Sequence, residues 1–174
     1  DYDLFYQEDI LPARQKLSLP KDKFIILIGS QNINDKLKDN SKLLEILKDL
    51  DERYQVVSFG KNPFNNKKII NFGFIKNKKI LRELYSSANM FLTFSKQEAF
   101  GKTLVESLRC GTPVVSNFNS SSEEIISHKE NGYIVRNDNF LEGINWIERN
   151  LNKQKKKIEI KIKENFSIQN ISQK

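Results

Sequence analysis

The chain has few of the residues that form reactive or cross-linked sites. Its 174 residues include a single cysteine, Cys110, and a single histidine, His128. One cysteine excludes an internal disulfide, and beside a helix end it is more typical of a small buried hydrophobe than of a nucleophile. With one histidine, the sequence offers no support for a Ser–His catalytic pair or for a histidine-rich metal site. No apolar run approaches the roughly 20 residues that a transmembrane helix needs.

Positive charge is in excess, but it is spread along the chain. Lysine and arginine number 29 against 22 acidic residues, which gives a formal net charge of +7. The lysines are spread along the whole chain beside many asparagines and isoleucines, so we treat them as background composition and expect no nucleic-acid partner. A basic face would still suit phosphates or an anionic membrane surface.

The length suits one domain with its own core. The sequence begins with Asp1-Tyr2 rather than methionine, and we therefore expect a piece of a longer chain. We expect it in the cytoplasm, with a peripheral position at the inner face of the membrane as an open alternative.

Apolar strands alternate with amphipathic helices, which predicts an α/β fold with a Rossmann-like parallel sheet and helices on both faces. Ile80 is expected on the inner face of one helix, and Asp138 is expected to cap another. The tail fits either an alternating strand or a helical stripe, and its lysines favour the helix. The predicted strands are 24–28, 54–59, 69–72, 90–94, 113–116 and 132–135, and the predicted helices are 12–17, 43–50, 77–87, one around Glu106 that ends at Gly111, 123–127, 140–151 and 153–163.

The stretch 91–110, FLTFSKQEAFGKTLVESLRC, combines a strand, a polar loop and a helix. A turn at Phe100-Gly101 before a helix is a natural anion site, because unpaired backbone N–H groups point outward there. Glu98 and Glu106 flank the turn. Carboxylates only accept hydrogen bonds, so they suit sugar hydroxyls on either side of a diphosphate. The spacing alone favours the alternative of two solvated surface glutamates.

The run SKQEAFGKTLVESLRCGTPVV, residues 95–115, resembles the hallmark of the family 4, or group 1, retaining glycosyltransferases, which have the GT-B fold. Segments 1–29 and 131–135 (NGYIV) also resemble that family, so the likeness covers nearly the whole chain. It implies a leading segment at 1–20, a nucleotide-sugar-binding domain at 21–152 and C-terminal helices at 153–174. The matching positions in the hallmark are Glu98, Phe100, Gly101, Glu106, Gly111, Pro113, Val114 and Val115.

The resemblance implies the donor-binding, C-terminal half of a hexosyltransferase that takes a UDP- or GDP-linked sugar. It implies no cofactor and no divalent metal, and an acceptor-binding N-terminal domain upstream. Glu98 would contact the transferred sugar and Lys38 the diphosphate, as the catalytic pair. Glu106 would bind the ribose. The other implied donor contacts are Phe100, Gly101, Lys102, Thr103 and Leu104 around the diphosphate, Phe74 and Ile75 beside the base, and Ser30 where the family has arginine.

Other functions fit parts of the pattern. A silent sugar-nucleotide-binding or scaffold module and a GT-B-fold epimerase stay open, whereas a phosphorylase would need a pyridoxal-binding lysine context that the sequence does not show. A flavodoxin-like receiver needs acids after its first strand, and Gly29-Ser30-Gln31-Asn32 has none. Ser120-Ser121 replaces the family's Gly-Gly, so that loop is expected to differ in shape because serine disfavours positive φ.

Overall fold

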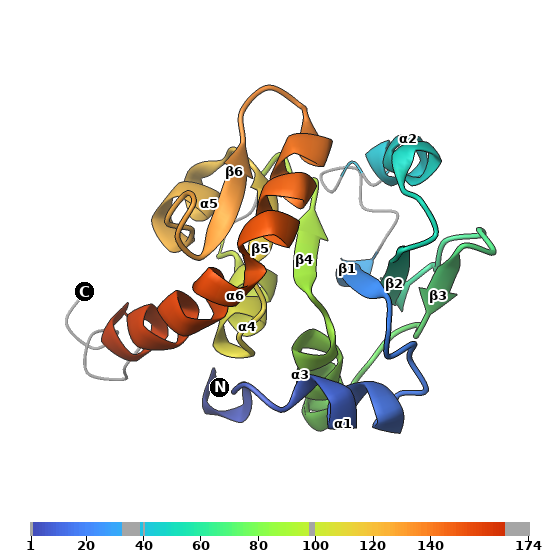
Figure 1. Cartoon of the computed structure of the whole chain (residues 1–174), viewed down its shortest axis with the longest axis horizontal. Coiled ribbons are helices and arrows are strands. Elements are labelled where there is room, and N and C mark those ends of the chain that lie inside the picture. Colours follow the sequence, from blue (N-terminus) through green and yellow to red (C-terminus); the bar gives the residue numbers. More distant parts are fainter. Residues whose placement is uncertain (1, 33–38, 40, 98–99, 166–174) are drawn as a thin grey trace.

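The computed structural model describes residues 2–32, 39, 41–97 and 100–165 (Figure 1). It contains a six-stranded sheet in the order β3-β2-β1-β4-β5-β6, and every neighbouring pair is parallel. The predicted parallel α/β sheet is therefore confirmed. The strands are β1 (Phe24–Asn32), β2 (Tyr54–Lys61), β3 (Ile69–Asn71), β4 (Met90–Thr93), β5 (Val114–Asn117) and β6 (Gly132–Val135).

Helices cover both faces of the sheet, as the sequence predicts. Alternate residues of β1 enter two separate hydrophobic clusters, with Ile25 and Leu27 in one and Ile26 and Ile28 in the other. Side chains of α3 and α4 pack in the first cluster and those of α2 in the second, while α6 contributes to both. The helices are η1 (Tyr2–Leu4), α1 (Ile10–Lys16), α2 (Lys42–Asp49), α3 (Lys78–Ser87), α4 (Lys102–Arg109), α5 (Ser120–Ile125) and α6 (Phe140–Asn165).

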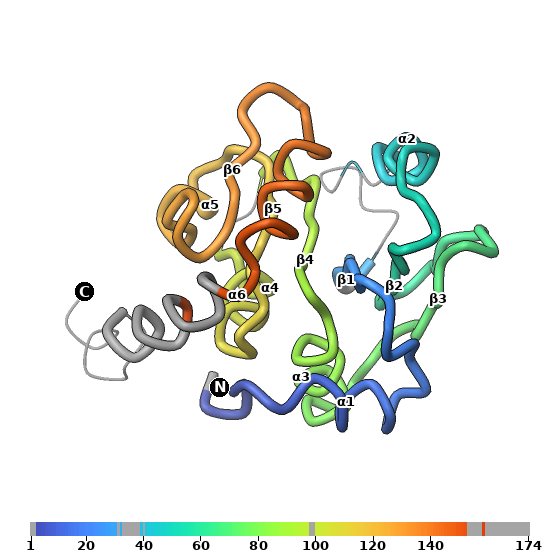
Figure 2. The backbone as a smooth tube through the Cα atoms, viewed as in Figure 1, coloured from blue at the N-terminus to red at the C-terminus, as the bar shows by residue number. Residues whose placement is uncertain are grey.

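The amino-terminal segment lies against α3 at the end of the sheet where the strands begin (Figure 2). Arg14 of α1 is only 3% exposed. Its guanidinium donates to four acceptors, which we call the Arg14 cluster: the carbonyls of Ser87 (2.8 Å), Lys21 (3.0 Å) and Lys23 (3.0 Å), and Asn89 Oδ1 (2.6 Å). These bonds join α1 to the connection between α3 and β4 and to the segment that enters β1.

Several helix ends differ from the prediction. Helix α5 begins at Ser120, three residues earlier than predicted, because Asn119 and Ser122 form a reciprocal capping box. Ser120 and Ser121 therefore form its first turn and are not loop residues. Asp138 does not cap α6, because it has a positive φ of 59° and the Asn139 side chain accepts the Glu142 N–H instead.

Two further expectations concern α3 and the tail. Ile80 was expected on the inner face of α3 but is 37% exposed, since the buried side of that helix centres on Leu81, Leu84 and Tyr85. Helix α6 runs without a break from residue 140 to residue 165, which confirms a helical tail. Ser167, whose residue type suits the cap of a further short helix, lies outside the described residues. Within the part of the chain that the structure describes, no helix is long and apolar enough to cross a membrane.

Candidate functional site

The carboxyl ends of the parallel strands form one edge of the sheet. The chain order reverses between β1 and β4, which lie side by side with Leu27 opposite Phe91. In open parallel sheets, ligands bind in the crevice beyond the strand ends at such a reversal. We therefore call the segments that follow β1 and β4 the crevice loops.

Gly101 starts α4 at this edge. It is the N-cap residue, with a left-handed backbone at φ 54° and ψ 33°. The left-handed backbone favours glycine here, and a β-carbon at this position would lie 2.4 Å from Ile125 Cδ1, so the Ile125 side chain would have to shift. Its carbonyl accepts from Leu104 N (2.9 Å) and Val105 N (3.1 Å). The N–H groups of a helix's first turn have no carbonyl partner within the helix, and this suits an anion.

Glu106 lies one turn into α4 and is 8% exposed. The Tyr85 hydroxyl donates to its Oε2 at 3.2 Å, and Lys78 Nζ lies 3.7 Å from its Oε1. Burial raises the pKa of this carboxyl, and the nearby Lys78 ammonium partly offsets that increase. A carboxylate accepts about four hydrogen bonds, so the pairing with Tyr85 leaves capacity for hydroxyl groups of a ligand.

The helix dipole stabilises charge mainly within the first turn. Glu106 is the fifth residue of α4, whose first residue is Lys102. Burial and its two partners, Tyr85 and Lys78, therefore govern this carboxylate. No local sequence signal indicates either partner, because both lie on α3, far from Glu106 along the chain.

The other predicted site residues lie at different depths. Phe100 is 75% exposed and Phe74 is 43% exposed, with Lys61 Nζ 5.2 Å from the centre of the Phe74 ring. Ile75 is partly buried against the first hydrophobic cluster. Ser30 is 7% exposed, and its hydroxyl donates to the Asn32 carbonyl at 2.7 Å.

Lys102, Thr103 and Leu104 form the first turn of α4, directly after the Gly101 turn. Leu104 packs in the core, with 2% of its surface exposed. Its backbone N–H already donates to the Gly101 carbonyl, so Lys102 and Thr103 carry the leading N–H groups of the helix. Lys38 and Glu98, predicted as the catalytic pair, both lie outside the described residues.

Two asparagines that no sequence motif indicates hold the backbone directly after β4. Asn117 Nδ2 donates to the Phe94 carbonyl at 3.1 Å, and Asn119 Nδ2 donates to the Ser95 carbonyl at 2.9 Å. Asn119 also caps α5. One side chain therefore holds both Ser95, just after β4, and the start of α5, whose Ile125 lies close to Gly101.

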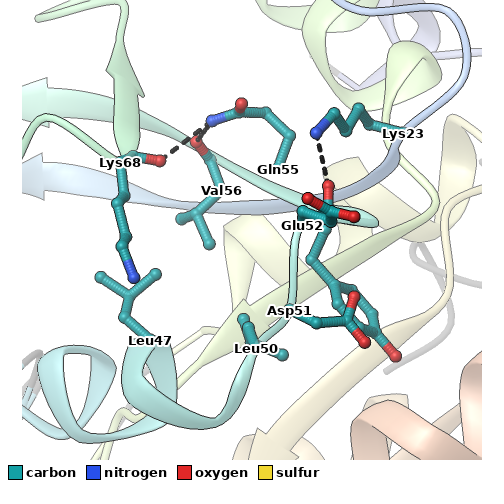
Figure 3. A pocket seen from close by; sticks show the side chains of 9 residues that line it. Lys23, Leu47, Leu50, Asp51, Glu52, Gln55, Val56 and Lys68 are labelled. Carbon is teal, nitrogen blue, oxygen red and sulfur yellow. Dashed lines mark hydrogen bonds between the residues drawn. The ribbon is translucent and has the colours of Figure 1, made fainter.

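A cavity of about 280 Å³ opens at the opposite edge of the sheet (Figure 3). Its lining residues come from the last part of α2, from the start of β2 and from the segments just before the strands. In Figure 3, Lys23 donates to the backbone carbonyl of Glu52. The lining residues are Lys23, Leu47, Leu50, Asp51, Glu52, Tyr54, Gln55, Val56 and Lys68. This cavity is thus separate from the crevice loops. Among the described residues, no group of three or more His, Cys, Asp or Glu side chains could hold a metal ion.

These features define a class of protein: a doubly wound parallel α/β domain with a glycine-started helix at its ligand-binding edge. The family model for glycosyl transferases group 1 matches residues 9–164. The chain belongs to the group 1 glycosyltransferase family.

Individual relatives agree with this assignment. "Probable sucrose-phosphate synthase" of Thermosipho melanesiensis is 30% identical over 125 residues, which are 67% of this chain and 28% of that protein. The crystal structure of the C-terminal domain of a group 1 family protein, LpcC of Francisella tularensis, gives a TM-score of 0.75 at 18% identity, covering 97% of this chain and 98% of that domain. The crystal structure of Anabaena HepE in complex with UDP-glucose gives a TM-score of 0.73 at 20% identity, covering 91% of this chain and 48% of that chain. The chain thus spans about half or less of two of these three proteins.

Proposed function

We propose that this chain is the nucleotide-sugar-binding domain of a retaining glycosyltransferase that transfers a hexose to a glycan, lipid-linked or other acceptor. The observation that carries the proposal is the position of α4. Its left-handed Gly101 start and its buried Glu106 lie on one short helix at the ligand-binding edge of the sheet. An anion site and a hydroxyl acceptor are thereby placed about one helical turn apart.

Each part of the donor has a matching group. The N–H groups at the start of α4, beside Gly101, Lys102 and Thr103, face the diphosphate together with Lys38. Glu106 accepts hydrogen bonds from the ribose hydroxyls, and Glu98 contacts the transferred sugar. These two acids keep the roles that the family resemblance implies.

The base lies beside the segment that joins β3 to α3. Phe74 and Ile75 belong to that segment, and Phe74 exposes 43% of its surface. A half-exposed ring offers an apolar face to a base. Ser30 contributes its backbone position only, because its hydroxyl donates to the Asn32 carbonyl. A UDP donor is favoured because a structural neighbour, HepE, was crystallised with UDP-glucose.

Catalysis in this proposal is electrostatic. As the bond from sugar to phosphate breaks, negative charge grows on the departing nucleoside diphosphate, and preorganised donors stabilise it. Lys38 and the α4 amino terminus supply that stabilisation without a divalent metal. The two acids do not act as the paired carboxylates of glycosidases, because the donor itself brings its leaving group.

Calorimetric titration with UDP, GDP and ADP, each in EDTA, tests the proposal. We expect one of the three to bind in EDTA, and added salt to weaken it because charge supplies part of the attraction. Binding that EDTA abolishes would contradict the metal-free site. Binding of none of them would contradict the function. We also expect no measurable sugar transfer by this chain alone, and a radiolabelled-donor assay with glycan acceptors would detect any.

A further inference from the structure

Lys96 and Asp39 form an ion pair between the two crevice loops. Lys96 follows β4, and Asp39 lies between β1 and α2. The distance from Lys96 Nζ to Asp39 Oδ2 is 2.9 Å. Because β1 and β4 are the strands between which chain order reverses, the pair lies at the rim of the crevice where ligands of such sheets bind.

The Lys96 side of this pair is exposed and exchangeable. The Lys96 side chain is 61% exposed and that of Asp39 is 20% exposed. Ion pairs open to solvent contribute little net stability. Lysine carries its charge on a flexible four-carbon stem, so its ammonium can reach a new partner without backbone movement.

Asp39 keeps other partners if Lys96 leaves. The Ser41 hydroxyl donates to Asp39 Oδ1 at 3.1 Å, and Lys42 Nζ lies 3.9 Å from Asp39 Oδ2. Lys42 is also paired with Asp138, which belongs to the β6–α6 connection. The hydrogen bond from Lys96 lowers the pKa of Asp39, and the same pairing raises the pKa of Lys96, so both groups are charged at neutral pH.

We propose that Lys96 is a further diphosphate-binding residue that exchanges Asp39 for the donor's phosphate oxygens. This inference rests on the proposed function. A diphosphate carries more negative charge than one carboxylate and offers more acceptor oxygens to an ammonium group. Lys96 also lies on the loop that leads to the α4 amino terminus. The loop then supplies a mobile cation close in sequence to the fixed backbone N–H groups in the first turn of α4.

The direction in which Asp39→Asn changes UDP affinity distinguishes this exchange from a purely structural ion pair. Lys96→Met removes the cation, and we expect UDP affinity to fall about tenfold while uridine affinity stays unchanged. Asp39→Asn releases Lys96 and removes a nearby negative charge, so UDP should bind more tightly. Calorimetry on the whole chain in EDTA measures both, with melting temperatures to show that each variant is folded and Lys96→Gln as a second cation-free variant.

The exposed pair Asp51–Arg53, at 3.0 Å, provides matched controls at the opposite edge of the sheet. Asp51→Asn and Arg53→Met change the net charge by the same amounts and should leave UDP affinity unchanged. If Asp39→Asn weakened UDP binding in parallel with Lys96→Met, the pair would be a brace between the loops and the inference would be wrong. No effect from either variant would also overturn it while leaving the proposed function intact. Failure of the unaltered chain to bind UDP, GDP or ADP would overturn both.

Discussion

The two edges of the sheet use positive side chains in opposite ways. At the edge where strands begin, Arg14 is 3% exposed and all its described partners are oxygen atoms of the protein. At the edge where strands end, Lys96 is 61% exposed and pairs with the Asp39 carboxylate of another loop. A buried cation with several hydrogen bonds joins segments permanently, whereas an exposed lysine remains available to an anionic ligand.

The neighbouring charges follow the same division. Arg82 Nε lies 2.6 Å from Glu8, and its guanidinium lies 4.0 Å from the centre of the Tyr6 ring, so the amino-terminal segment is held to α3. At the other edge, Arg136 lies 4.2 Å from the Phe118 ring, which is 45% exposed. We therefore expect substitutions at the first edge to change stability alone, and substitutions at the second edge to change nucleotide binding.

The largest expected effect is from Arg14→Leu. It leaves four acceptors of the Arg14 cluster without their donor, and we expect a loss of about 3–5 kcal/mol in the free energy of unfolding. Urea denaturation measures this loss. Arg14→Lys should recover only part of it, because an ammonium cannot reproduce the planar guanidinium geometry.

The exposed Arg53 serves as the control, and Arg53→Leu should cost far less stability than Arg14→Leu, because solvent-exposed ion pairs contribute little. Under conditions where Arg14→Leu is still folded, its UDP affinity should equal that of the unaltered chain. A selective loss of UDP binding by folded Arg14→Leu would contradict the view that the edge where strands begin affects stability alone.

Next in size are the two acids of the site. Glu106→Ala should weaken UDP alone as much as it weakens UDP-sugar, by about ten- to hundredfold, because a charged hydrogen-bond partner is worth roughly 1.5–3 kcal/mol. Glu98→Ala should leave UDP nearly unchanged and weaken only the UDP-sugar. Calorimetry with both ligands measures the contrast, and comparing ligands within one variant cancels any change in fold stability. Equal loss of UDP binding in both variants would reject this division of roles.

The next largest effect is expected from Gly101→Ala, on the stability of the fold. A left-handed backbone costs a residue with a β-carbon about 1–2 kcal/mol, and here the new atom would also lie 2.4 Å from Ile125 Cδ1. Gly73 offers a matched control, since its φ is 63° and a β-carbon there would have nothing within 4 Å. Thermal unfolding should show a greater loss for Gly101→Ala than for Gly73→Ala. Equal losses would mean that Ile125 moves aside freely.

The smallest effect concerns His128, whose Nδ1 accepts the Ile134 N–H at 3.1 Å. Burial lowers the pKa of His128 below 6.5, so the unfolded chain takes up the proton more readily than the folded one. The stability from neutral His128 is therefore fully present above pH 6.5 and is lost as the pH falls through the lower folded pKa. Melting temperature between pH 8 and pH 5 should fall more for the unaltered chain than for His128→Gln. Identical profiles would contradict this assignment.

The sequence predicted the layers of the fold because they depend on repeating patterns. The apolar run 24–28 required cover on both faces, and β1 indeed divides its side chains between two clusters. Gly111 was expected to end α4, and it has φ 73° just after that helix. The start of α5 was predicted wrongly because its capping box uses Ser122 in place of the usual Glu or Gln.

The sequence predicts a kind of site, which stays a prediction, but it does not predict the contacts between the site residues. The Phe100-Gly101 turn indicated an anion site, since glycine before a helix is a local signal. The Tyr85–Glu106 hydrogen bond and the Lys96–Asp39 ion pair join residues from different elements. Such pairs depend on how helices pack on the sheet, which no local pattern of one sequence records.

The Arg14 cluster also constrains the order in which the chain can fold. Asn89 Oδ1 accepts from both Arg14 Nη2 and Ile25 N, at 2.6 and 2.7 Å, across separations of 75 and 64 residues. Closing such long loops costs chain entropy before any contact forms, which slows the pairing of parallel strands. The cluster cannot form until β1, β2, β3 and α3 have all been traversed. During synthesis, α1 must therefore wait for Asn89 to emerge before it reaches its final position.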